Sequence, residues 1–232
     1  MREIVLDTET TGLDPASGDR VVEIGCVELL NHIPTGRHWH HYFNPEREMS
    51  QGAYEVHGLS TEFLSDKPLF KDLADDFLTF IEEARLVIHN ASFDIGFLNA
   101  ELERIDRGPI TMDQVVDTLA LARRKHPGAA NSLDALCKRY QIDNSARTKH
   151  GALLDSELLA EVYVELTGKR QARLELAAAG STTATEGGGS VAIRPRPAPL
   201  ERRLSDGEIA EHRNFVESLG SEALWNRYLR DN

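Results

Sequence analysis

The order of strand-like and helix-like patterns along the first 170 residues limits the fold more than any other feature of the sequence. Residues 2–7, 20–30 and 36–44 are rich in apolar, aromatic and β-branched side chains. Turn-forming residues separate these runs, with Pro15 in the first gap and Pro34 in the second. This spacing predicts a three-stranded antiparallel meander.

Helical and strand-like patterns alternate after the meander. Short helical turns are expected up to about residue 69. The predicted elements beyond it are a helix over 70–83, a strand over 85–89, a helix over 93–105, a strand over 114–118 and helices over 118–125, 131–140 and 152–167. A meander followed by such alternation predicts an α/β domain, in which helices pack on a mixed sheet.

The composition changes after residue 176. The following stretch is rich in Ala, Gly and Pro and poor in large apolar side chains, so it cannot bury enough surface to fold alone. We therefore expect a folded domain over 1–175, a flexible linker over 176–202 and a C-terminal segment over 203–232. That last segment regains an apolar pattern, and Ser205 and Glu208 have the spacing of a helix capping box.

Composition indicates a globular protein. Apolar residues make up 41% of the 232 residues, and no apolar run is long enough to span a membrane. The N-terminus resembles a first strand rather than a signal peptide, so we expect a cytoplasmic protein. Cys26 and Cys137 are isolated, which predicts buried free thiols and argues against a zinc site. A net charge of −12 predicts weak DNA binding by the chain alone, unless bound cations or a partner protein compensate.

Acidic residues recur at three places where predicted elements begin or end. Asp7 and Glu9 lie two apart on the first strand, so their side chains point to the same face. Asp94 follows a short apolar strand and lies in the first turn of the next helix. Asp155 lies five residues after His150, among leucines on a predicted helix. An acid in such apolar surroundings is costly to bury without a partner.

Each motif alone has an ordinary structural explanation, because acids are common at strand ends and in first helical turns, and His150 alone also fits a capping or surface histidine. The combination is more specific. Four acids on three elements beside a histidine fit a two-metal site, and oxygen ligands favour Mg²⁺ or Mn²⁺ over zinc. Two such ions about 3.5–4 Å apart support phosphodiester hydrolysis. A histidine is suited to take the proton from the attacking water.

Six segments of the sequence carry a resemblance to a known family. They are IVLDTETTG (4–12), EIGCVEL (23–29), VHGL (56–59), LVIHNASFDIGFL (86–98), NSLDALCKRY (131–140) and HGALLDSELLAEVY (150–163). Over about residues 2–170 the chain resembles the DEDDh exonucleases. Within them it most closely resembles the epsilon proofreading subunits of bacterial DNA polymerase III. The resemblance implies an RNase H-like fold with a five-stranded mixed sheet.

The resemblance also implies roles for individual residues. The metal-binding acids would be Asp7, Glu9, Asp94 and Asp155, which hold two Mg²⁺ or Mn²⁺ ions, and His150 would be the general base. Asp7, Glu9, Asp155 and His57 would contact the substrate. Close relatives carry an acid five positions before the histidine that corresponds to His57, where this chain has Gly52. His89 and Asn90 are expected to hold the strand–helix junction rather than to act in catalysis.

The family further implies a substrate and partners. The substrate would be a mispaired, single-stranded 3′ end of DNA, removed during replication. The C-terminal segment, with Trp225 as an apolar anchor, would bind the polymerase alpha subunit. A glutamine-led peptide with the anchors Gln171, Leu174 and Leu176 would contact the sliding clamp, although a frayed helix end explains this peptide equally well. Two alternative functions stay open: an RNA-trimming exonuclease with the same catalytic residues, and a non-catalytic adaptor between polymerase and clamp.

Overall fold

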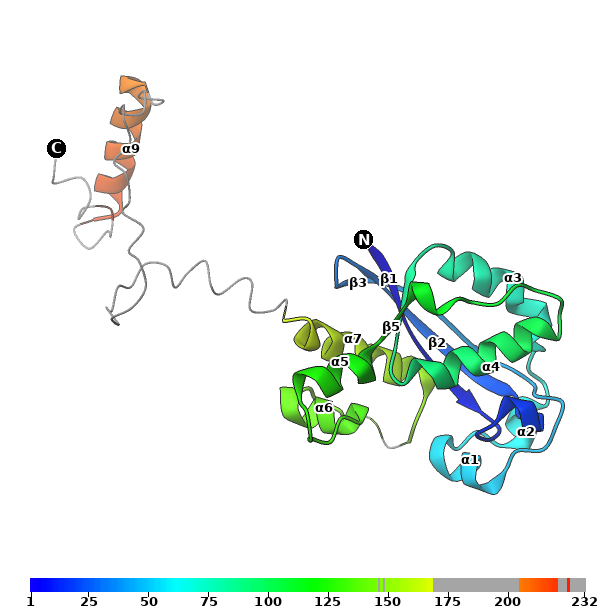
Figure 1. Ribbon diagram of the computed structural model, residues 1–232. Helices are drawn as coiled ribbons and strands as arrows, with labels where there is room; N and C mark the ends of the chain where they lie inside the picture. The colour runs from blue at the N-terminus through cyan, green and yellow to red at the C-terminus, as the bar shows by residue number, and fades with distance from the viewer. Residues whose placement is uncertain (146, 148, 169–204, 221–224, 226–232) are drawn as a thin grey trace. The chain divides into compact units, whose positions relative to one another are not determined.

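The structure is a computed structural model that describes residues 1–145, 147, 149–168, 205–220 and 225 (Figure 1). The chain divides into two compact units, Met1–Ser181 and Thr182–Asn232, and each is described by itself.

A mixed sheet forms the centre of the first unit. Within the described residues its strands are β1 (Arg2–Thr10), β2 (Val21–Leu30), β3 (Ile33–Tyr42), β4 (Arg85–Ile88) and β5 (Val115–Asp117), in the spatial order β3-β2-β1-β4-β5. The pairs β1–β2 and β2–β3 are antiparallel, whereas β1–β4 and β4–β5 are parallel. The predicted α/β class and mixed five-stranded sheet are confirmed.

Helices cover both faces of this sheet (Figure 1). The helical segments of the first unit are η1 (Pro15–Ser17), α1 (Gln51–His57), α2 (Thr61–Leu64), α3 (Phe70–Ile81), α4 (Ala91–Glu103), η2 (Met112–Gln114), α5 (Thr118–Lys125), α6 (Leu133–Tyr140) and α7 (Ala152–Leu166). Ile4 and Leu6 of β1 join the core formed with α3 and α4, while Val5 joins the core formed with α7. The alternation of β1 therefore sends its even-numbered side chains to one helical layer and its odd-numbered side chains to the other.

The third strand begins earlier than the sequence predicts. Asn31 and His32, with φ of 53° and 66°, form a two-residue turn between β2 and β3. Positive φ at both central positions matches the twist of a tight hairpin. Pro34 therefore lies in β3, the edge strand, where its missing N–H is tolerated. The expected start at residue 36 was wrong because Pro34 was interpreted as part of the turn.

Helix α7 approaches the sheet very closely at Gly25. A Cβ added at Gly25 would lie 2.3 Å from the main-chain carbon of Ala152, so any larger residue would displace the start of the helix. The hydroxyl of Ser156 donates a hydrogen bond of 2.9 Å to the carbonyl of Gly25. Gly25 pairs with Asp7 across the β1–β2 ladder. The first turn of α7 therefore lies beside the acidic end of β1.

The described part of the second unit is mainly helix α9 (Asp206–Ser218). The predicted capping box is present, since Ser205 and Glu208 exchange hydrogen bonds at the helix start. Val216 is buried, whereas Phe215 and Trp225 are exposed. Among the described helices, none is both long and apolar enough to cross a membrane.

Candidate active site

Asp7 and Glu9 bring two carboxylates to the face of β1 that α7 covers. They have the same parity as Val5, which packs in the core against α7. Glu9 is buried and lies opposite Glu23 of β2 in the ladder. The register of the ladder shifts between Glu9 and Thr10, the last residue of β1. The predicted common orientation of Asp7 and Glu9 thus places both acids beneath the start of α7.

Asp94 reaches the same place from the parallel half of the sheet. Strand β4 ends at Ile88, and Asn90 adopts a left-handed conformation (φ 64°) just before α4 begins. This sharp turn puts Asp94 in the first turn of α4, where it is buried. Oδ1 of Asp94 accepts hydrogen bonds from the amide and the hydroxyl of Thr8, at 3.1 and 2.8 Å. These hydrogen bonds hold Asp94 against Thr8, the residue between Asp7 and Glu9 in β1.

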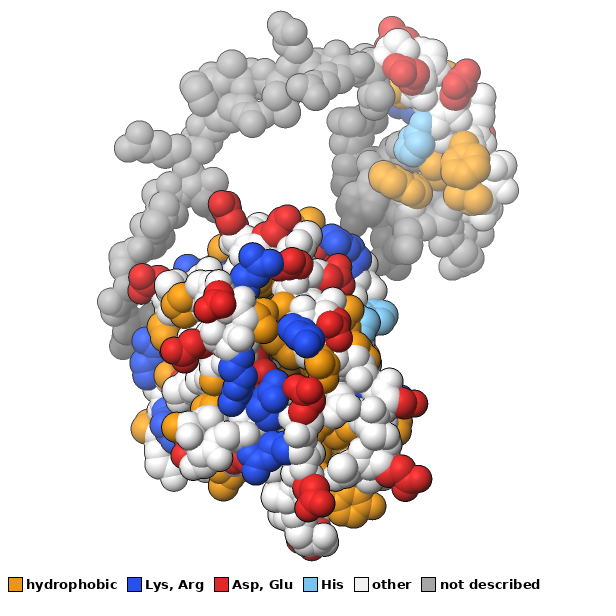
Figure 2. All heavy atoms as spheres, turned by 90° about the vertical axis from the view of Figure 1, so that its right-hand side faces the viewer, with side chains coloured by type: hydrophobic (Ala, Val, Ile, Leu, Met, Phe, Trp, Pro, Cys, Tyr) orange, Lys and Arg blue, Asp and Glu red, His pale blue; other side chains and the backbone are white. Residues whose placement is uncertain are grey.

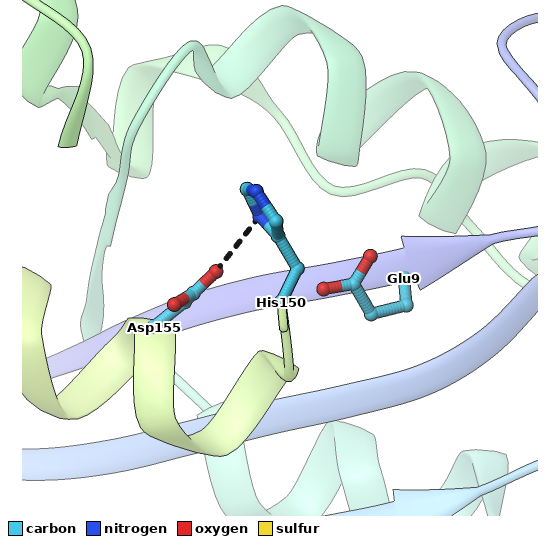
Figure 3. Close-up of side chains that lie close together, drawn as sticks. All are labelled: Glu9, His150 and Asp155. Carbon is cyan, nitrogen blue, oxygen red and sulfur yellow. Dashed lines mark ion pairs between the residues drawn. The ribbon is translucent and has the colours of Figure 1, made fainter. Parts of the chain in front are cut away.

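His150 and Asp155 come from the last helix of the domain and the loop before it. Figure 3 shows the side chains of His150 and Asp155 turned toward each other, with the carboxylate of Glu9 pointing toward this pair from β1. Nδ1 of His150 lies 3.2 Å from Oδ2 of Asp155. One ligand atom from each of these three residues lies within 4.8 Å of the others. The group therefore has the donor types and the spacing that a divalent cation requires.

All five predicted catalytic and metal-binding residues line one cavity of about 660 Å³. Its wall also includes His57 and Gly52 of the α1 region, and Asp134 and Arg147 on the opposite side. Residues that are far apart in the sequence thus converge on one pocket.

The carboxylates in this cavity repel one another and are shielded from water. Burial raises the pKa of Glu9 to about 8, and the charge of the adjacent Glu23 adds to the rise. Burial also raises the pKa of Asp94 to about 7, although the hydrogen bonds from Thr8 oppose it. Burial, followed by the charges of Asp94 and Glu9, holds the pKa of Asp7 well above its ordinary value. Such a cluster of acids is stabilised by protons or by cations.

Asp155 differs from the other acids because it has a permanent cation beside it. Arg147 donates from Nε to Oδ1 of Asp155 at 2.5 Å and from Nη2 to Oδ2 at 2.7 Å. Burial acts to raise the pKa of Asp155, but the hydrogen bonds from His150 and Arg147 and the guanidinium charge outweigh it, so the pKa is lowered. Arg147 also contacts Nδ1 of His150 at 2.7 Å and Oδ1 of Asp134 at 2.7 Å. It therefore links the candidate base to a candidate metal ligand.

Sequence analysis missed Arg147, Asp134 and Glu23. Glu23 and Asp134 lie in two segments that carry the family resemblance, 23–29 and 131–140, but none of the three residues has a spacing that indicates catalysis. The available signal was the position of Arg147, three residues before His150 and eight before Asp155, which places a cation next to the acidic motif. Glu23 could be found only from the strand register.

His57 and His89 have backbone or hydroxyl partners. The Nδ1 atom of His57 accepts from the amide of Leu59 at 3.0 Å, and its Nε2 lies 3.3 Å from the carbonyl of Thr10. His57 lines the cavity, but both ring nitrogens are occupied, so its expected substrate contact stays a prediction. His89 pairs with the hydroxyl of Thr118 at 2.9 Å, as expected of a residue that holds the junction.

Other predicted residues have different outcomes. Cys26 and Cys137 are buried free thiols, as predicted. Gln171, Leu174 and Leu176 lie outside the described residues. Trp225 is 54% exposed, and its ring meets that of His212 edge-on at 5.2 Å.

Comparison with known proteins assigns the family. A protein family described as Exonuclease matches residues 4–163. The DNA polymerase III subunit epsilon of Rickettsia felis is 49% identical over 94% of this chain and 97% of its own length. The subunit of the same name from Escherichia coli is 45% identical over 97% of both chains. The chain belongs to the epsilon-subunit family of exonucleases.

Solved structures agree with this assignment. Exonuclease X, in a complex with 5′ overhanging duplex DNA, aligns with a TM-score of 0.56 and 26% identity over 72% of this chain and 92% of that one. The nuclease domain of 3′hExo, a DEDDh family member bound to rAMP, aligns with a TM-score of 0.63 and 16% identity over 72% of this chain and 92% of that one. At this identity the similarity shows the fold alone. The RNase H-like fold, the resemblance to epsilon subunits and the expected proofreading 3′→5′ exonuclease function are confirmed. Dependence on a divalent metal follows from the family, and the donor atoms of this epsilon-family site fit such a cation.

Proposed function

We propose that this chain removes mispaired nucleotides from the 3′ end of single-stranded DNA with two divalent cations, Mg²⁺ or Mn²⁺, held by Asp7, Glu9, Asp94 and Asp155. The observation that carries the proposal is the convergence of four carboxylates and His150 in one cavity. Bound cations would lower the pKa of a water molecule and stabilise the departing 3′ oxygen.

The side chains of the cavity have separate tasks in this proposal. His150 takes the proton from the attacking water, and its position on the loop before α7 leaves it accessible to solvent. Arg147 orients His150 and Asp155 through hydrogen bonds to both. Asp94 is kept in place by Thr8, so the cations would meet a largely prearranged set of oxygens. Prearrangement of this kind reduces the reorganisation needed during the reaction.

The test compares the full chain with Asp155→Ala on a primer with a mispaired 3′ end, in the presence of Mg²⁺ or Mn²⁺. The full chain should release 5′-mononucleotides, and the variant should release none while keeping its circular dichroism spectrum. Equal activity of the two proteins would exclude Asp155 from the mechanism. Digestion of single-stranded DNA and RNA of the same sequence separates the proofreading proposal from RNA trimming. Failure to hydrolyse either one would favour the adaptor function.

We further propose that the C-terminal segment attaches the nuclease to the polymerase alpha subunit. Support comes from relatives named as subunits of DNA polymerase III and from exposed Phe215 and Trp225 in this unit. Attachment through a linker would keep the nuclease at high local concentration near the primer end. A pull-down with the full chain and a version that ends at residue 176 tests this. Equal capture of alpha by both would disprove it. Contact with the sliding clamp through Gln171, Leu174 and Leu176 is proposed on sequence alone.

A further inference from the structure

One segment of this acidic chain, beside the active site, carries more basic than acidic residues. Between the start of α5 and the start of α7 (118–151) there are seven Lys and Arg residues and only two acids, Asp134 and Asp143. By contrast, the face of the first unit in Figure 2 mixes basic and acidic side chains. The segment from α5 to α7 is therefore the part of this domain that is best suited to meet a polyanion.

A groove of about 650 Å³ opens on this segment next to the catalytic cavity. The two hollows share three lining residues, His89, Asn90 and Ser132. Beyond these three, the groove runs along α5 and the loop that leads to α6, where Arg123 and Asn131 line it. The groove thus continues the cavity toward the basic segment.

The charge of the lining changes from the cavity to the groove. The cavity is lined by five acids, which are Asp7, Glu9, Asp94, Asp134 and Asp155. The described lining of the groove contains no carboxylate, and Arg123 is its only Lys or Arg residue. Arg123 is exposed, and no ion pair among the described residues includes it. Within the groove its guanidinium therefore has no carboxylate beside it, while on its other side Arg123 borders a second hollow that Asp113 and Asp117 also line.

The outer wall of the groove is built by side-chain hydrogen bonds. Nδ2 of Asn131 donates to the carbonyl of Ala129 at 2.9 Å, and Nη2 of Arg139 donates to the carbonyl of Ala130 at 3.0 Å. Gly128, with φ of 75°, makes the turn that these bonds hold. The wall is consequently formed before a ligand arrives, which limits the entropy lost on binding.

We propose that this groove binds the phosphodiester backbone of the nucleotides that precede the 3′-terminal one, with Arg123 pairing with a backbone phosphate. The proposal rests on the proposed function, because the terminal nucleotide must occupy the adjoining cavity. A phosphate on Arg123 would place the strand along the uncharged wall of the groove, away from the carboxylates of the cavity. It would also give an acidic chain its own contact to DNA, without a partner protein.

Arg124 offers a matched control. It is the neighbouring residue on α5 and is also exposed. Both arginines line a second hollow together with Asp113 and Asp117, but Arg124 does not line the groove. Arg123→Gln and Arg124→Gln therefore remove the same charge from adjacent positions, and only the first removes it from the groove. Arg123→Lys keeps the charge and controls for loss of the side chain.

The experiment uses the full chain with Mn²⁺ and two substrates: an oligothymidylate, and the p-nitrophenyl ester of thymidine 5′-monophosphate, which has no preceding nucleotide. In Arg123→Gln the ratio of the two kcat/KM values, oligonucleotide over ester, should fall roughly tenfold, as expected for loss of one charge-assisted contact. The dependence of log(kcat/KM) for the oligonucleotide on log[salt] should become shallower by about 0.7, the value for one phosphate contact on a single strand. Arg124→Gln should leave both quantities unchanged, and Arg123→Lys should restore the slope.

An unchanged ratio in Arg123→Gln, or an equal fall in both Gln variants, would overturn the proposal. Unfolding curves of the variants check that each is folded. If the unaltered chain cleaves neither substrate, the proposed function itself fails, which is a separate result.

Discussion

Arg147 grips Asp155 with two parallel hydrogen bonds, from Nε to Oδ1 at 2.5 Å and from Nη2 to Oδ2 at 2.7 Å. Both side chains are largely buried, with 7% and 3% of their surfaces exposed. These two hydrogen bonds join the loop before α7 to a carboxylate that is proposed to bind metal. It keeps Asp155 ionised in a cavity where burial raises the pKa values of the other three acids.

Replacement of Arg147 by Gln should reduce both stability and turnover. The loss of a charge-assisted double hydrogen bond should cost about 1.5–3 kcal/mol of unfolding free energy in metal-free buffer. Added Mn²⁺ should recover part of this loss, since a cation can compensate the exposed charge of Asp155. Urea unfolding with and without Mn²⁺ measures both effects. Arg147→Lys cannot form the pair of parallel hydrogen bonds, so its unfolding free energy should lie between those of Arg147→Gln and the unaltered chain. A Lys variant as stable as the unaltered chain would show that charge alone matters.

His150→Gln should separate a proton-transfer role from a metal-ligand role. If His150 is the base, kcat should drop by roughly 10²–10⁴-fold. The affinity for Mn²⁺, measured by calorimetry in the absence of substrate, should then change little, because the carboxylates would provide the ligands. A large loss of Mn²⁺ affinity would instead make His150 a ligand, as its closeness to Glu9 and Asp155 also allows. An unchanged kcat would remove it from the reaction.

Stability in metal-free buffer should fall as the pH rises from about 6.5 to 8. The pKa of Glu9 is raised from 4.5 to about 8, and that of Asp94 to about 7. In this window the folded state holds protons that the unfolded chain has already released, so deprotonation favours unfolding. The lowered pKa of Asp155 does not oppose this trend, because its contribution is complete above its ordinary value of 3.8. Burial lowers the pKa values of His57 and His89, whose contribution to stability rises with pH and is complete above their ordinary value of 6.5.

Thermal unfolding in EDTA between pH 5 and 8.5 tests this expectation. The unfolding temperature should decline above about pH 6.5, and Mn²⁺ should raise it most at the alkaline end, where cations no longer compete with protons. Asp7→Asn should flatten the decline, since it removes one of the repelling carboxylates. A midpoint that rises steadily from pH 5 to 8 would contradict the assignment of raised pKa values.

Gly25→Ala should destabilise the domain and damage the site together. Its Cβ would meet the backbone of Ala152 and Leu153, so α7 must move away from β2. Overpacking of this kind costs about 1–3 kcal/mol. Gly96→Ala in α4 is the matched control, because an added Cβ there meets nothing within 4 Å and alanine favours the helix. The unfolding free energy, measured by chemical denaturation, and the exonuclease rate should both fall for Gly25→Ala but not for Gly96→Ala. Equal stability of the two variants would show that α7 tolerates displacement.

Sequence alone predicted the elements whose patterns are local. The alternation in β1 correctly gave Asp7 and Glu9 one orientation, and the apolar strand before His89 correctly marked the junction that carries Asp94. The turn at Asn31 and His32 was missed because edge strands tolerate Pro34, so a residue typical of turns lay inside a strand. Arg147 could not be found in this way, since its role comes from a three-dimensional contact and not from periodicity.

The candidate site takes its acids from both ends of the domain: Asp7 and Glu9 from β1, and Asp155 from α7. During synthesis, the first two leave the ribosome some 150 residues before the third. A nascent or prematurely terminated chain that lacks α7 also lacks Asp155, and one that ends before residue 150 lacks His150 as well. On the proposed mechanism such a fragment would hold an incomplete set of metal ligands, so an unfinished copy of this nuclease would not cleave DNA.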